Sequence, residues 1–128
     1  MIVVDSSVLV ELLSDRPAGR VAGDRLQSEE IAAPDIVDTE VASALRGLWL
    51  GGLLDDEGLL RALDDLAELS ITHYASSTLI PRAIELRHIL TPYDGAYVAL
   101  AEALDCTLLT YDHRIRHAPG TRCRIEAP

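Results

Sequence analysis

The sequence contains no lysine, and its eleven basic residues are all arginine. They are outnumbered by 21 acidic residues, which gives a formal net charge of −10. This balance argues against a broad electrostatic grip on nucleic acid, which normally requires a basic face. Part of the acidic excess is functional if several carboxylates gather to hold cations. We expect most of it on solvated helix faces, as for Asp55, Asp56, Asp64 and Asp65.

Cysteine is scarce as well, with only Cys106 and Cys123 in the chain. Two cysteines are too few for a disulfide scaffold, and both lie in strand-like runs, so we predict small buried side chains. No apolar run approaches the roughly 20 residues of a membrane span. The Met1 end has no basic region or cleavage site of the kind that marks export. We therefore expect a cytoplasmic protein without a membrane anchor.

The 128 residues are 48% hydrophobic, which excludes a disordered chain and suffices for one core. No repeat, low-complexity tract or linker is visible, so we predict a single domain over residues 1–128. Short apolar runs predict five strands. They are Ile2–Val4, Glu30–Ala33, Leu69–Thr72, Thr107–Thr110 and Arg122–Glu126.

Helical patterns lie between these strands, because apolar residues recur there at spacings of three and four. Gly51 and Gly52 end one of these helices, and Pro81 suits the first position of another, where a missing N–H costs least. The predicted helical segments are Val8–Leu13, Val37–Leu48, Leu59–Leu66, Arg82–Ile89, Thr91–Leu104 and His113–Ala118. Strands that alternate with helices predict an α/β fold with a parallel sheet covered on both faces.

Asp5 lies at the junction of the first strand and the first helix, in the stretch VVDSSVLV. An Asp at such a junction is often only a helix cap, because its oxygens accept hydrogen bonds from free backbone N–H groups. However, ligands of open α/β sheets bind beyond the carboxyl ends of the strands. Asp112, which follows the strand Thr107–Thr110 after one residue, belongs at that same edge, although it also suits a cap of the short helix after it.

Two further acids are predicted near helix starts on apolar stripes. Glu40, in PDIVDTEVASAL, aligns with Val41 rather than with the solvated face, and earlier acids already occupy the first turn. Asp94, in TPYDGAYVALAEAL, lies three residues after Thr91, a spacing that also resembles a capping box. Each acid alone has a structural explanation, and only the set of four at one edge suggests a site.

Four carboxylates in one place repel one another strongly. A pair about 4 Å apart costs roughly 4 kcal/mol at an effective dielectric constant of about 20. Bound cations would neutralise this charge, and a purely oxygen ligand set selects the hard ions Mg²⁺ or Mn²⁺ rather than zinc. The spacing therefore predicts a divalent-cation site at the sheet edge.

Three stretches resemble the PIN-domain ribonucleases, and particularly the VapC-type toxins of bacterial toxin–antitoxin pairs. VVDSSVLVELL is similar to the opening strand and turn of that family, IVDTEVASALRG to its Glu-bearing helix, and LTPYDGAYVALAEALDCTLLTYDHRI to its closing motif. The resemblance follows the family order along the chain. Residues 53–77 carry no diagnostic motif, and there it rests on length and pattern alone.

The resemblance implies a three-layer α/β/α sandwich and a metal-dependent endoribonuclease of a type II toxin–antitoxin pair. By motif, Asp5, Glu40, Asp94 and Asp112 would coordinate one or two Mg²⁺ or Mn²⁺ ions. Ser7 and Thr110 would hold these acids in place without binding the metal themselves. The implied partners are an RNA substrate, a cognate antitoxin protein and a second copy of the chain. The apolar stretch Leu48–Leu50 offers surface for such contacts.

Other polar residues have weaker claims. His113 and His117, four residues apart, suit a metal on a helix face, but no other ligand is near in the sequence, so a solvated turn is favoured. The arginines at positions 82, 87, 114 and 116 are either RNA contacts or ordinary surface charges. Tyr93 and Tyr111 are candidates to stack on bases, whereas Tyr97 at apolar-helix spacing favours the core.

Three other functions are compatible with acids at the ends of strands in a small α/β fold. A phosphorylation-switched receiver domain also has acids at strand ends, but that family requires a lysine and this chain has none. A catalytically silent PIN-like binding module would have little reason to keep four mutually repelling acids. An RNA-processing or DNA-acting nuclease of the same fold outside a toxin–antitoxin pair stays open, although the absence of a further domain favours a toxin.

Overall fold

The computed structural model describes residues 1–128 and contains a five-stranded sheet in which every pairing is parallel. The strands are β1 (Ile2–Val4), β2 (Ile31–Pro34), β3 (Ile71–Tyr74), β4 (Thr107–Leu109) and β5 (Ile125–Glu126). Their spatial order is β3-β2-β1-β4-β5. The chain thus builds outward from β1 in one direction and then returns to its other side, so the strand order reverses between β1 and β4.

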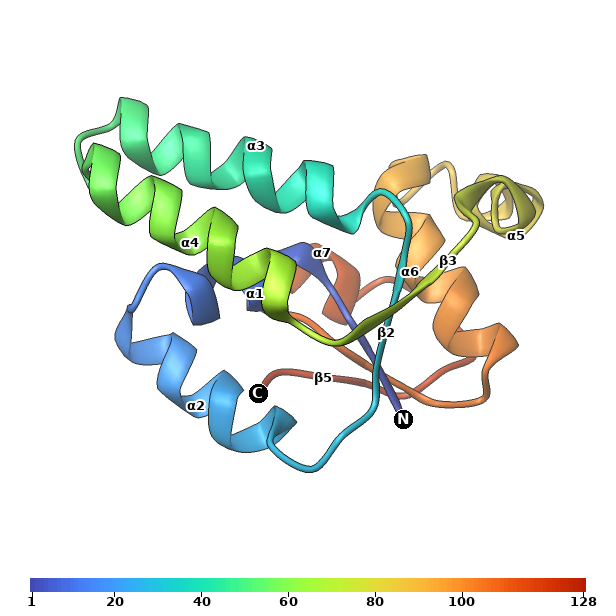
Figure 1. Cartoon of the computed structure of the whole chain (residues 1–128). Coiled ribbons are helices and arrows are strands. Elements are labelled where there is room, and N and C mark those ends of the chain that lie inside the picture. The colour runs from blue at the N-terminus through green and yellow to red at the C-terminus, as the bar shows by residue number, and fades with distance from the viewer.

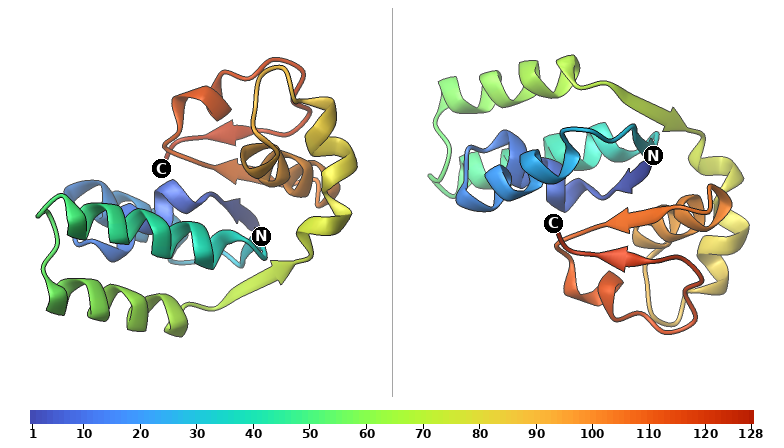
Figure 2. Two further views of the ribbon diagram at one scale, coloured as in Figure 1. Left: turned by 90° about the horizontal axis from the view of Figure 1, so that it is seen from above. Right: turned by 90° about the horizontal axis from the view of Figure 1, so that it is seen from below.

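Seven α-helices and one 3₁₀ turn connect the strands. They are α1 (Ser6–Leu13), α2 (Pro17–Leu26), α3 (Val37–Leu50), α4 (Asp56–Glu68), η1 (Ser76–Thr78), α5 (Ile80–Glu85), α6 (Pro92–Ala103) and α7 (His113–Arg116). Helices α1 to α4 pack together on one side of the sheet, and α5 and α6 lie on the other (Figures 1 and 2). The predicted α/β/α sandwich with a central parallel sheet is confirmed.

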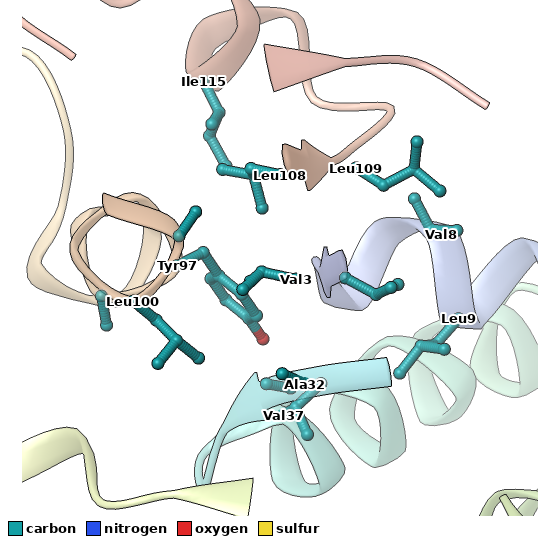
Figure 3. Packing of buried hydrophobic residues seen from close by; sticks show 14 of the residues in the cluster. Val3, Val8, Leu9, Ala32, Val37, Tyr97, Leu100, Leu108, Leu109 and Ile115 are labelled. Carbon is teal, nitrogen blue, oxygen red and sulfur yellow. The ribbon is translucent and has the colours of Figure 1, made fainter. Parts of the chain in front are cut away.

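The core fills the space between the sheet and both helix layers. Tyr97 and Leu100 of α6 lie on one side of Val3 in β1, and Val8 and Leu9 of α1 lie on the other (Figure 3). Strand β1 is therefore buried on both faces, as its uninterrupted apolar sequence indicates. The same packing fixes the residue after β1, Asp5, in the interior.

The predicted elements differ from the observed ones mainly at their ends. Strand β3 begins two residues later than predicted, because Leu69 still belongs to the end of α4. Helix α5 ends at Glu85, four residues before the predicted end. Helix α3 does end at the Gly51–Gly52 pair, where Gly52 takes a positive φ of 75° that favours glycine.

Helix α2 was missing from the prediction, because two glycines in PAGRVAGDRL weaken its helical pattern. Gly19 has a packing role in this helix. A Cβ at Gly19 would lie 2.2 Å from the carbonyl oxygen of Glu11 and 2.9 Å from the Cα of Leu12. The absence of a side chain thus allows the backbones of α1 and α2 to approach closely.

The two cysteines are free thiols, but both are only partly buried, which corrects the prediction of buried side chains. The strand-like run that suggested burial is shorter than it seemed, because β5 consists of Ile125 and Glu126 alone and Cys123 lies outside it. Burial still raises the pKa of the Cys123 thiol to about 11. None of the helices combines the length and the apolarity needed to cross a membrane.

The close approach of α1 and α2 is testable with a pair of glycine variants. Gly19→Ala should lower the free energy of unfolding by about 1–3 kcal/mol, because the new methyl group meets backbone atoms that cannot move aside. Gly23→Ala in the same helix is the control, since its Cβ would only touch the Leu12 side chain at 3.4 Å. Urea unfolding followed by circular dichroism measures both. Equal midpoints for the two variants would contradict the close packing at Gly19.

Candidate active site

Asp5 is the most buried carboxylate of the chain, with 4% of its surface exposed. It caps the N-terminus of α1 by accepting a hydrogen bond from the backbone N–H of Ser7. Its Oδ2 also accepts hydrogen bonds from the hydroxyl groups of Ser7 and Thr110, the latter at 2.8 Å. Because all three bonds go to Oδ2, the second oxygen, Oδ1, is left for another ligand.

Ser7 and Thr110 tie the end of β1 to the end of β4. The Ser7 hydroxyl accepts a hydrogen bond from the backbone N–H of Tyr111 at 3.0 Å, and that of Thr110 accepts one from the N–H of Asp112 at 2.9 Å. Each hydroxyl therefore donates to Asp5 and accepts from the segment after β4. Both hydroxyls therefore position the Asp5 carboxylate, and their supporting role at a metal site stays a prediction.

Glu40 lies half-buried on α3 and is held by Tyr97, whose phenol donates a hydrogen bond to Oε2 at 2.5 Å. Burial raises the pKa of Glu40, and the charges of Asp5 and Asp94 add to that rise. Tyr97 itself is fully buried, as predicted, but its apolar spacing did not indicate the polar contact with Glu40. Its position three residues after Asp94, on the same face of α6, was the available signal.

Asp94 occupies the first turn of α6, where the Thr91 hydroxyl accepts a hydrogen bond from the Asp94 backbone N–H at 3.2 Å. The return bond of a full capping box, from the Thr91 N–H to the Asp94 carboxylate, is not formed. Burial raises the pKa of Asp94, followed by the charges of Asp5 and Asp112. The Thr91 side chain and the Arg114 charge act in the opposite direction and lower this pKa.

Asp112 caps the short helix α7, as the sequence allowed, by accepting a hydrogen bond from the backbone N–H of Arg114 at 2.7 Å. The Arg114 guanidinium also grips both of its oxygens, with Nη2 to Oδ2 at 2.7 Å and Nε to Oδ1 at 3.2 Å. These contacts hold the pKa of Asp112 below its ordinary value. The same Nη2 lies 3.8 Å from Oδ2 of Asp94, so one arginine links two of the four acids.

The four predicted acids thus share the edge at which the strand order reverses, between β1 and β4, where open α/β sheets bind ligands. Their carboxylates influence one another electrostatically. In this arrangement, however, no three Asp, Glu, His or Cys side chains lie close enough together to hold a metal ion. The all-oxygen donor set suits Mg²⁺ or Mn²⁺, but the side chains must draw together around the ion.

The structure gives no support for a functional role of the histidine pair or of Arg82. His113 and His117 stack with ring centroids 3.9 Å apart and have no third ligand nearby, which argues against a metal between them. Arg82 is held by Glu102, Glu85 and the Gly120 carbonyl, so its role is structural. The acids at positions 55, 56, 64 and 65 are exposed, as predicted.

The three tyrosines differ in how accessible they are to a nucleic-acid base. Tyr97 is too buried to meet a base, and the hydroxyl of Tyr111 donates to the Ala18 carbonyl at 2.8 Å. Tyr93, next to Asp94, is 61% exposed and lines a mostly apolar hollow with Ile36, Pro92 and Ala96. Of the three, Tyr93 is the one whose ring is exposed enough to stack on a base.

Comparison with known proteins gives a match to the PIN domain over residues 2–120. The chain belongs to the PIN-domain family. It is 42% identical over 129 residues to ribonuclease VapC1 of Mycobacterium tuberculosis, covering 97% of this chain and 95% of that protein. The expected resemblance to PIN-domain ribonucleases of the VapC type is therefore confirmed.

Solved structures show the same fold. VapC20 of M. tuberculosis, described as a sarcin-ricin loop cleaving toxin, has a TM-score of 0.70 at 15% identity and covers 95% of this chain and 97% of its own. A chain from the VapBC2 complex of Rickettsia felis, bound to a DNA fragment from its promoter, has a TM-score of 0.67 at 17% identity. It covers 99% of this chain and 98% of its own. At these identities, the likeness establishes the fold alone.

The raised pKa values of Glu40 and Asp94 predict how stability depends on pH. Folded protein binds these protons more tightly than unfolded chain, so metal-free stability should fall as pH rises from the ordinary carboxyl pKa through the raised values. Asp112 acts oppositely, because its lowered pKa adds stability that is lost as pH falls from the ordinary carboxyl pKa through the lowered value.

Asp94→Asn separates a site acid from a simple helix cap. Because the variant removes one repelling charge, it should melt higher than wild type in EDTA at pH 7 and show a flatter decline with pH. Thermal melts at a series of pH values in EDTA measure this. If Asp94 served only its helix, the variant would instead lose about 0.3–1 kcal/mol of helix-dipole stabilisation. A lower melting temperature at pH 7 would therefore show that Asp94 only caps its helix.

Proposed function

We propose that this protein is a metal-dependent endoribonuclease that acts as the toxin of a type II toxin–antitoxin pair. The observation that carries the proposal is the position of Asp5, buried at the strand-order reversal and accompanied there by Glu40, Asp94 and Asp112. Family membership and the ribonuclease VapC1 relative point to the same activity. Residues 1–128 would form a single nuclease domain.

The four acids would hold Mg²⁺ or Mn²⁺ and serve as the catalytic residues. When bound, such an ion lowers the pKa of a water molecule and offsets negative charge on the phosphate and the leaving oxygen. Ser7 and Thr110 fix the direction of the Asp5 carboxylate, since both hydroxyls donate to the same oxygen.

No side chain is placed as a covalent nucleophile. The Ser7 hydroxyl already donates to Asp5 and accepts from the Tyr111 N–H, and no histidine contacts it. Water is therefore the attacking group in this proposal. As the family resemblance implies, the products would carry a 5′-phosphate and a 3′-hydroxyl.

Three partners complete the proposal: an RNA substrate, a cognate antitoxin and a second copy of the chain. The R. felis structure contains a related toxin together with its antitoxin, which supports the second. Exposed apolar side chains near the end of α3 support protein contacts, since Trp49, Leu50 and Leu53 are 40%, 60% and 75% exposed. We place the protein in the cytoplasm, as the scarcity of cysteine indicates.

Two alternatives within the family remain. A PIN-fold nuclease outside a toxin–antitoxin pair would keep the same site, and an adjacent gene for a short DNA-binding antitoxin distinguishes it from a toxin. A catalytically silent binding module would not benefit from a buried Asp5 with two hydroxyl donors and three acids around it. We therefore favour the enzyme over the binding module.

Removal of the metal should abolish cleavage of cellular RNA, and Mg²⁺ or Mn²⁺ should restore it. Replacement of each of the four acids by its amide should lower activity by more than about 100-fold, because outer contacts of metal sites alone account for about 10–100-fold. Asp64→Asn, an exposed acid on α4, is the matched control and should retain activity. Gel assays of RNA cleavage measure both effects. Equal cleavage in EDTA would show that the metal mechanism is wrong.

The proposed assemblies are tested by light scattering and co-expression. The protein should form a dimer, and a basic antitoxin encoded next to it should co-purify and block cleavage. A protein that stays monomeric at high concentration speaks against the dimer. Repeated failure to isolate a complex with the adjacent gene product speaks against the toxin assignment, but leaves the nuclease activity intact.

A further inference from the structure

Arg114 makes a set of contacts that helix capping does not require. The cap of α7 is complete once the Asp112 carboxylate accepts the Arg114 backbone N–H. The guanidinium nevertheless grips both oxygens of Asp112 and reaches to 3.8 Å from Asp94, which lies on a different helix. Its side chain is 71% exposed, so no packing forces this position.

No other arginine joins the four acids. The ion pairs of Asp94 and Asp112 are both made by Arg114, and neither Asp5 nor Glu40 has an ion-pair partner. Arg116, two residues further along α7, is exposed and takes no part in the ion pairs of Asp94 and Asp112. Arg114 is thus the one cationic group of the chain within the carboxylate site.

We propose that Arg114 is the resident counter-ion of this site and a phosphate-binding residue of the reaction. Without metal, its guanidinium neutralises Asp112 and Asp94. Asp112 and Asp94 would then exchange the Arg114 guanidinium for a divalent ion when one binds. The inference rests on the proposed metal-dependent nuclease function and assigns to it a residue that binds RNA.

Once released from the carboxylates, the Arg114 guanidinium would bind an RNA phosphate. A chain with a net charge of −10 and no lysine repels RNA, so the phosphate needs cations directly at the site. A phosphate that approaches the carboxylate-bound ion also comes within reach of a side chain that already spans Asp112 and Asp94. The planar guanidinium matches phosphate oxygens with two parallel hydrogen bonds.

The competition is tested by Mn²⁺ titration without RNA, with isothermal titration calorimetry as the readout. Arg114→Ala should bind Mn²⁺ about two- to fivefold more tightly than wild type, since it removes an exposed competing ion pair. Arg116→Ala carries the same charge change on the same helix, without the contacts, and should bind as wild type does. Equal affinity of Arg114→Ala and Arg116→Ala would overturn the counter-ion role.

The phosphate role is tested by RNA cleavage kinetics at saturating Mn²⁺. Arg114→Ala should raise KM for RNA, Arg114→Lys should restore it in part because charge returns without the planar fork, and Arg116→Ala should leave it nearly unchanged. An unchanged KM in Arg114→Ala would overturn the phosphate role. The proposed function fails separately, because wild-type protein would then bind no Mn²⁺ at the site and cleave no RNA.

Discussion

The structure depends on the burial of one acidic group, the Asp5 carboxylate, at the carboxyl end of the central strand of a parallel sheet. Burial of a charge is costly unless hydrogen bonds or an opposite charge compensate it. Here, the Ser7 and Thr110 hydroxyls and the Ser7 backbone N–H supply three donors to one oxygen. Because β1 and β4 are neighbours, the same two hydroxyls also fix the segment that carries Asp112. The sheet order therefore determines both the position of the acid and its support.

The negative charges of the other three acids are compensated to different degrees. Glu40 has no cation beside it, and Asp94 has only the Arg114 guanidinium at 3.8 Å, so burial together with acidic neighbours raises the pKa of each. Asp112 is neutralised by Arg114, and its pKa falls. Glu40 and Asp94 are thus placed to attract a cation. Asp112 already has one, the Arg114 guanidinium. A bound divalent ion would satisfy all three acids, at the expense of the Arg114 contacts.

The order of the strands along the chain and the place of the four acids near one sheet edge could be predicted because they follow simple rules, whereas the role of these acids stays a prediction. The apolar run Ile2–Val4 has to be buried, and the residue after it has to meet the ends of neighbouring parallel strands. Features that depend on tertiary contacts were not predictable. The spacing of Tyr97 predicts a core residue and gives no sign of its hydrogen bond to Glu40. The sequence likewise does not indicate that the Arg114 side chain contacts Asp112 and Asp94. Helix α2 was not predictable either, because Gly19, which weakens its helical pattern, is needed for close packing on α1.

The central claim is that these four carboxylates form one divalent-cation site, and a crystal structure of the protein grown with Mn²⁺ tests it most directly. The account predicts an anomalous difference peak bounded by Asp5, Glu40, Asp94 and Asp112, with the Arg114 guanidinium turned away from Asp112. A peak elsewhere, such as beside His113 and His117, or Arg114 still bound to Asp112 with no ion among the acids, would contradict it.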